Sequence, residues 1–115
     1  GDALYQQEKL DEALAEYQEA ARLSSNNPEV LAGMGQVYLA QSSYFKAVVT
    51  FRKLTEIEPN NPRGYHNLGI ALKARGRNSE AISNLDRALA LYESEGNEEE
   101  AENVAVLIDE IDNDD

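Results

Sequence analysis

Cysteine is absent from this 115-residue chain, and histidine occurs once, as His66. Without cysteine there can be neither a disulfide framework nor a thiolate metal site. A lone histidine on a predicted helix has no Ser/His/Asp arrangement around it on one face, and it cannot form a two-histidine metal site. We therefore expect no enzymatic activity, no metal and no cofactor.

Basic residues are scarce as well: 10 Lys and Arg stand against 22 Asp and Glu, which gives a net charge of −12. This balance argues against nucleic acid as a partner, because binding to phosphate backbones needs clustered Lys and Arg. The charge is also uneven. Residues 93–115 hold eleven acids and no base, whereas residues 62–79 hold four bases and no acid, namely Arg63, Lys73, Arg75 and Arg77.

The chain lacks any apolar run of about 18 residues, the length that a membrane-spanning helix requires. It also shows no signal peptide. The sequence predicts no membrane insertion by this segment and a cytoplasmic or cytoplasm-facing location. The repeat pattern described next begins part-way through its first copy. The sequence therefore leaves open whether a targeting or anchor segment precedes residue 1.

What the chain does contain is a 34-residue period. Asn26-Asn27-Pro28 recurs as Asn60-Asn61-Pro62. Self-similarity at a period of this size is typical of stacked helical repeats, which bury a thin continuous core between neighbours. We expect one domain made of a partial repeat at 1–27, repeats at 28–61 and 62–95, and a capping helix with an acidic tail at 96–115. The residues that recur at equal spacing are Gly1, Gly35 and Gly69; Ala13, Ala47 and Ala81; and Tyr17, Phe51 and Leu85.

Apolar periodicity and capping residues predict where the helices lie. Asn27 and Asn61 each precede proline, a combination that favours a helix start. Gly76 and Gly96 mark helix ends. In the first copy, Lys9-Leu10 is the expected turn and Asp11 the expected cap of the following helix. Glycine inside a helix costs about 1 kcal/mol relative to alanine. Its recurrence at Gly35 and Gly69 therefore predicts close contacts with the partner helices that carry Ala47 and Ala81, where a larger side chain would push the helices apart. The expected helices are 2–7, 11–23, 28–41, 44–57, 62–75, 79–94 and 98–112.

The repeat resembles the tetratricopeptide repeat. The residues that carry the likeness are Leu31, Met34, Gly35, Tyr38, Ala47, Phe51, Leu54 and Pro59 in the central copy, and Tyr65, Leu68, Gly69, Leu72, Ala81, Leu85 and Ala88 in the third. The resemblance implies an all-α fold of antiparallel helix pairs, stacked in a right-handed superhelix. A C-terminal capping helix would close it with an apolar face of Ala101, Val104, Ala105, Ile108 and Ile111.

The resemblance also implies a function. In that family the first helix of each pair lines a concave groove, which here includes Asp2, Tyr5 and Gly33 and becomes basic in the third copy. We expect a protein–protein scaffold or adaptor that binds a peptide with an acidic segment. The tail loosely resembles the ends of cyanobacterial and plastid members of the family, some of which assist photosystem assembly. One subfamily clamps the C-terminal tails of chaperones, and this chain departs from its motif at Gly33, Asn67 and Asp2. We therefore do not expect binding to chaperone tails. The alternative is self-association, as a homo-oligomer, through the edge at Leu4. The candidate groove contacts are Gln36, Arg63, His66, Asn67, Ile70 and Lys73.

Overall fold

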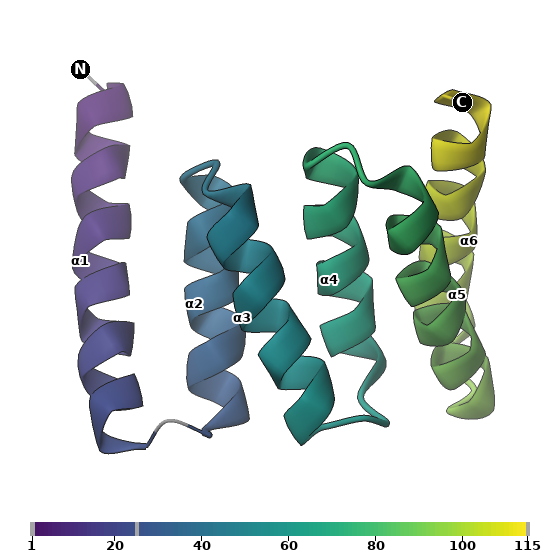
Figure 1. Ribbon diagram of the computed structural model, residues 1–115, viewed down its shortest axis with the longest axis horizontal. Helices are drawn as coiled ribbons and strands as arrows, with labels where there is room; N and C mark the ends of the chain where they lie inside the picture. Colours follow the sequence, from purple (N-terminus) through teal and green to yellow (C-terminus); the bar gives the residue numbers. More distant parts are fainter. Residues whose placement is uncertain (1, 25, 115) are drawn as a thin grey trace.

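The computed structural model describes the backbone of residues 2–24 and 26–114, and the side chains of residues 6–24 and 26–113. These residues form six α-helices and no strand (Figure 1). Within this part of the chain, none of the helices is both long and apolar enough to cross a membrane. The helices are α1 (Asp2–Leu23), α2 (Pro28–Ala40), α3 (Tyr44–Ile57), α4 (Pro62–Ala74), α5 (Asn78–Ser94) and α6 (Glu98–Asp114).

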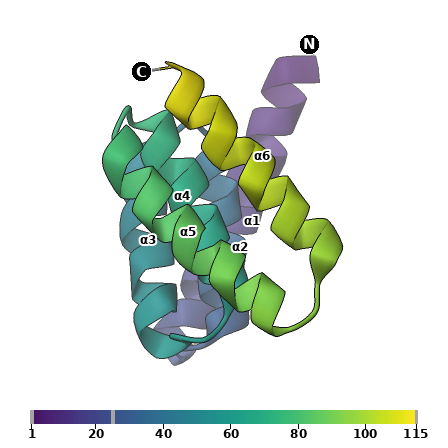
Figure 2. The same ribbon diagram turned by 90° about the vertical axis from the view of Figure 1, so that its right-hand side faces the viewer.

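Each helix packs mainly against its neighbours along the chain. The pairs α2–α3 and α4–α5 run antiparallel side by side, with α1 at one end of the row (Figure 1). At the other end α6 lies across α5 and closes the array (Figure 2). This arrangement confirms the predicted fold of stacked antiparallel helix pairs with a C-terminal cap.

The helix boundaries follow the capping residues. The Asn27 side chain accepts hydrogen bonds from the backbone of Glu29 and Val30, and Asn61 accepts one from Arg63. Both prolines occupy the first helical turn, where the missing N–H has no intrahelical partner. Gly76 and Gly96 adopt left-handed φ values of 80° and 76°, as a glycine after a helix end commonly does. The predicted starts and stops from residue 27 onward are therefore confirmed within one or two residues.

The recurring glycines mark close helix–helix contacts. A Cβ atom on Gly35 would overlap the ring of Phe51, and one on Gly69 would overlap the side chain of Leu85. Ala47 and Ala81 on the partner helices are fully buried. The predicted close approach is confirmed, and the side chains that occupy the space next to the glycines are those of Phe51 and Leu85.

The buried residues form one continuous cluster that runs through α2 to α6. In α6, Ala101, Val104 and Ile111 are buried and Ile108 is partly buried. Ala105, which was expected on the same apolar face, is exposed. The covered side of α6 consists of residues 101, 104, 107, 108 and 111, and Ala105 lies at the edge of that side, toward solvent.

The predicted turn at Lys9-Leu10 is wrong, since α1 continues through it as one helix of 22 residues. At the equivalent turn, the later copies have Ser42 and Gly76 with positive φ. The first copy has Glu8 there, a good helix former that disfavours the left-handed region. Asp11 is correspondingly not a cap. Its carboxylate accepts hydrogen bonds from Gln7 at 3.2 Å and from Gln41 at 2.8 Å, and the second bond links α1 to the end of α2.

Gly33 also differs from the prediction. A Cβ atom there would overlap the ring of Tyr17 on α1, so Gly33 is the point at which α1 approaches α2 rather than part of an open groove. The side chains of Asp2, Leu4 and Tyr5 lie outside the described residues. The groove contacts expected of Asp2 and Tyr5, and the self-associating edge expected at Leu4, stay predictions.

Candidate peptide-binding surface

Three helices that begin at the same end of the molecule form the framework of the candidate surface. They are α2, α4 and α6 (Figure 1). Each is preceded by an asparagine whose side-chain oxygen accepts a hydrogen bond from the first turn. The bonds measure 3.0 Å for Asn27, 3.0 Å for Asn61 and 3.2 Å for Asn97. Because an N-cap is worth about 1 kcal/mol, these bonds hold the helix starts in place beside one another.

A cleft of about 730 Å³ lies between the starts of α2 and α4. It brings together three of the predicted contacts, Gln36, Arg63 and Asn67. The Gln36 amide donates to the Asn67 side-chain oxygen at 3.1 Å. This bond leaves the Gln36 carbonyl and the Asn67 NH₂ group to pair with the backbone of an extended ligand. The other lining residues are Asn27, Pro28, Glu29, Ala32, Leu54, Glu58 and Asn61.

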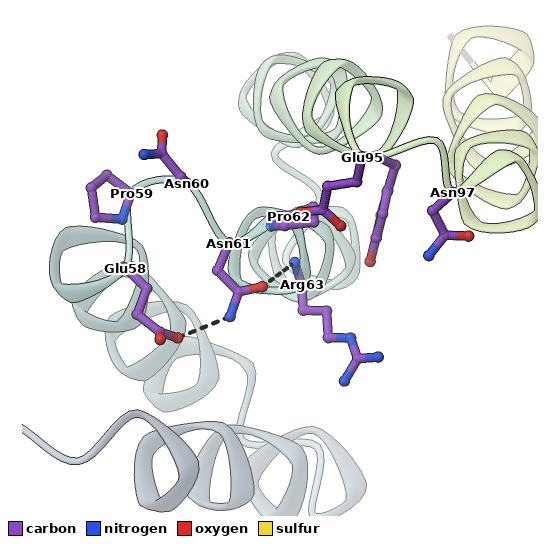
Figure 3. Close-up of a pocket in the computed structure, with 9 residues that line it drawn as sticks. Glu58, Pro59, Asn60, Asn61, Pro62, Arg63, Glu95 and Asn97 are labelled. Carbon is purple, nitrogen blue, oxygen red and sulfur yellow. Dashed lines mark hydrogen bonds between the residues drawn. The ribbon is translucent and has the colours of Figure 1, made fainter.

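Arg63 lies between this cleft and a second hollow of about 640 Å³ toward α6. Figure 3 shows its guanidinium pointing away from the side chains of Glu58 and Asn61. Among the described residues no carboxylate forms an ion pair with Arg63. Glu58 is held instead by Asn61, whose amide donates to it at 2.9 Å. Arg63 is therefore a cation that is available to a ligand.

His66 lies in a polar cluster built from three helices. Its Nδ1 is 3.2 Å from the Tyr92 hydroxyl on α5 and 3.8 Å from a Glu100 carboxylate oxygen on α6. The rings of His66 and Tyr92 meet edge-on, with centroids 5.8 Å apart. The His66 side chain is only 19% exposed. It therefore serves mainly to join α4 to the capping helix.

Lys73 is also directed toward α6. Its ammonium lies 4.0 Å from Glu110, and Ile70, half-buried, lies between His66 and Lys73 along α4. An exposed pair at this distance contributes little to stability. It does place an acid of the capping helix beside the basic stripe of α4, by which we mean Arg63, His66 and Lys73. The six predicted contacts thus divide into Gln36, Arg63 and Asn67 in the cleft, and His66, Ile70 and Lys73 along the side of α4 that faces α6.

Burial sets the protonation of the polar cluster. It lowers the pKa of His66, and the nearby Glu100 carboxylate opposes this shift without cancelling it. Burial, assisted by Glu100, raises the pKa of Tyr92 to about 12. Both groups are accordingly neutral at pH 7. The Tyr92 hydroxyl can donate a hydrogen bond to the Glu100 carboxylate while it accepts one from the Nδ1–H of His66.

Lowering the pH from 7.5 to 5.5 is expected to reduce the free energy of unfolding through His66. Its folded-state pKa lies below the ordinary value of about 6.5, so between the two values the unfolded chain binds more protons. The stabilisation is complete above pH ~6.5 and is lost as the pH falls toward the folded-state value. Urea titrations at pH 7.5, 6.5 and 5.5 would measure this loss, and His66→Asn should show a smaller one. An equal loss in both proteins would contradict the assignment.

Sequence reasoning did not identify Tyr92, Glu100 and Glu110 as neighbours of the basic stripe, nor Glu58 and Asn61 as part of the cleft. One signal was present: Tyr92 is a large aromatic at a repeat position where the central copy has Glu58. The way α6 crosses α5 decides which acids reach α4, and no local pattern reports that crossing.

Comparison with known families identifies the architecture. The sequence profile of the TPR repeat matches residues 1–42 and 35–76, and the tetratricopeptide repeat profile matches residues 62–94. The chain belongs to the tetratricopeptide repeat family. The predicted membership is thus confirmed, whereas the division at residues 27, 61 and 95 stays a prediction.

Two relatives and one solved structure place this TPR chain further. A TPR repeat-containing protein of Picosynechococcus sp. is 34% identical over 68 residues, covering 59% of this chain and 18% of the relative. Photosystem I assembly protein Ycf3 of Synechococcus sp. is 34% identical over 80 residues, covering 67% and 46%. The Yersinia enterocolitica type III secretion chaperone SycD, solved with a peptide of the translocator YopD, superposes with a TM-score of 0.84 at 22% identity, covering 94% and 83%. The chain spans less than half the length of these two relatives.

Proposed function

We propose that this TPR chain is a protein–protein interaction module without catalysis of its own. It would act as a scaffold or adaptor that helps a larger complex to assemble. The observation that carries the proposal is the cleft between α2 and α4, which combines an available guanidinium with side-chain amides. An assembly protein among the relatives and a peptide-bound chaperone of the same fold support it.

The position of Arg63 favours a carboxylate as its ligand. Arg63 is the second residue of α4, where the helix dipole favours acids; α2 and α6 carry Glu29 and Glu99 in their first turns. A base at this position is mildly unfavourable to the fold, typically by 0.3–1 kcal/mol, so its presence is better explained by binding than by stability.

Glu29, Glu58 and Glu95 line the two hollows around Arg63. These carboxylates would repel a run of acids, because like charges at close range raise the energy of the complex. The proposed ligand is therefore an extended segment with one acidic residue at Arg63. Its backbone would pair with Gln36 and Asn67. This is narrower than the acidic segment predicted from the sequence, because His66 and Lys73 already face acids of α6.

The test is a selection from a random phage-displayed peptide library on the wild-type protein and on Arg63→Gln. Wild type should enrich peptides with a recurrent acidic residue, and Arg63→Gln should lose that enrichment. In titrations of the strongest peptide, Arg63→Gln should bind at least about tenfold more weakly, since a hydrogen bond to a charged group is worth about 1.5–3 kcal/mol.

Lys53→Gln is the matched control, because Lys53 is an exposed base that lines neither hollow. It should bind like wild type. Raising the salt concentration should weaken wild-type binding and leave Arg63→Gln little changed. Peptides without an acidic position, or equal affinities for all three proteins, would show that Arg63 only solvates α4.

A further inference from the structure

A second surface stands out on α3, where two large apolar side chains face solvent one turn apart. Phe45 is 62% exposed and Val49 is 52% exposed. At the same repeat positions the first copy has Asp11 and Ala15, and the third has Ser79 and Ser83, all of them exposed. The repeat fold therefore does not need apolar residues here, and Phe45 and Val49 require another explanation.

Four of the ten bases of the chain surround this apolar pair. The Arg75 guanidinium stacks over the Phe45 ring, 5.0 Å from its centroid. The residues Lys46, Arg52, Arg75 and Arg77 line two hollows of about 480 and 230 Å³ that border Phe45. Among the described residues lining them, Glu80 is the single acid, and it pairs with Arg52 at 3.5 Å and with Arg77 at 3.2 Å. We call Phe45, Val49 and these four bases the Phe45 patch.

The Phe45 patch is separate from the peptide cleft. Arg63 belongs to the first turn of α4 and Arg75 follows its last residue. A separation of twelve residues along a helix corresponds to roughly 18 Å. None of the residues that the structure describes lines both the cleft and the patch. A ligand in one can therefore leave the other open.

We propose that the Phe45 patch docks an acidic amphipathic helix of another protein. Phe45, Val49 and Arg52 follow one another at i, i+4 and i+7, a stripe about 10 Å long that a partner helix can lie along. Apolar side chains of that helix would cover Phe45 and Val49. Flanking carboxylates would meet the guanidinium groups of Arg52, Arg75 and Arg77, whose charge Glu80 offsets only in part.

Charge decides between a separate partner and a second copy of this chain. The chain carries a net charge of −12, so two copies repel one another over most of their surfaces. A short acidic helix meets the local positive charge without bringing a second acidic globule close. The patch thus fits a partner whose acids are confined to the docking segment.

The probe is a labelled peptide with the sequence of residues 98–113, an acidic amphipathic segment without a base. Its control has every Glu and Asp replaced by Gln and Asn. Fluorescence anisotropy should show binding of the acidic peptide that weakens as salt rises, and at least tenfold weaker binding of the control. Amide chemical-shift changes in the labelled protein should cluster at residues 43–52 and 75–77.

The decisive variant is Phe45→Ser/Val49→Ser, which installs the residues that the third copy has at these positions. Its thermal midpoint should match that of wild type while peptide affinity falls at least tenfold. Arg75→Gln, which leaves the apolar pair intact, should weaken binding several-fold. Leu23→Ser, which removes a 75%-exposed apolar residue elsewhere, should bind like wild type.

Several results would overturn the proposal. Equal binding of the acidic and amide peptides would remove the charge argument. Shift changes confined to α5, or unchanged affinity in the double serine variant, would place the peptide on another surface. Sedimentation that shows concentration-dependent dimers, lost in the double serine variant, would make a second copy the occupant instead of a separate partner.

Discussion

Deletion of residues 98–115 is expected to abolish cooperative unfolding and to make the protein aggregate. The α6 side chains Val104 and Ile111 are fully buried, and Leu107 and Ile108 pack partly against the same cluster. Burying one such side chain is worth about 1.5–3 kcal/mol, so the first two alone account for roughly 3–6 kcal/mol. That is a large share of the 5–15 kcal/mol that typically stabilises a whole domain. Circular dichroism melts and light scattering would measure both effects.

A matched pair of substitutions tests whether the buried side chains of α6, rather than the helix as such, stabilise the fold. Val104→Asp introduces a charge at a buried position, whereas Val106→Asp introduces the same charge two residues away, where the side chain is 51% exposed. The first should destabilise the fold nearly as much as the deletion, because an unpaired buried charge is costly. The second should be close to neutral. A truncated protein that stays soluble and melts like wild type would make α6 an appendage.

The parts of the fold that the sequence predicts well are those decided locally. Asn27 and Asn61 cap the helices they precede, and Gly76 and Gly96 adopt the left-handed conformation that ends a helix. In each case the capping residue and the helix end that it determines lie within one short segment of the chain. The glycine contacts were predictable for a different reason: Gly35 and Gly69 recur at the repeat period, and that recurrence indicates a shared packing role.

The errors occur where the outcome depends on what lies beyond the local segment. The predicted turn at Lys9-Leu10 is absent, because Glu8 stands where Ser42 and Gly76 adopt positive φ in the later copies. Ala105 belongs to the apolar periodicity of α6, but the helix is covered on one side only. For the candidate site, three of the six predicted contacts, Gln36, Arg63 and Asn67, line one cleft, and their role in binding stays a prediction. The sequence pattern could not show that α6 sets Glu100 and Glu110 against His66 and Lys73.

Phe51→Ala is expected to lower the free energy of unfolding by about 3–5 kcal/mol. The Phe51 side chain is 0% exposed and is one of the largest fully buried side chains among the described residues. It fills the space in front of Gly35, so its removal leaves a cavity between α2 and α3 that neither helix can close without moving. Chemical denaturation would give the loss directly. Phe45→Ala, six residues earlier on the exposed face of α3, is the matched control and should cost well under 1 kcal/mol.

Gly35 turns this result into a test of the contact itself. In wild type, Gly35→Ala should destabilise, because the added methyl group overlaps the Phe51 ring and overpacking of this kind costs about 1–3 kcal/mol. In the Phe51→Ala background the ring is gone. The same substitution should then stabilise by about 1 kcal/mol, since alanine favours a helix over glycine by that amount. The sign of the effect thus reverses between the two backgrounds, and a double-mutant cycle measures the coupling. If Gly35→Ala were equally destabilising in both, the glycine would be required for a reason other than the aromatic ring packed against it.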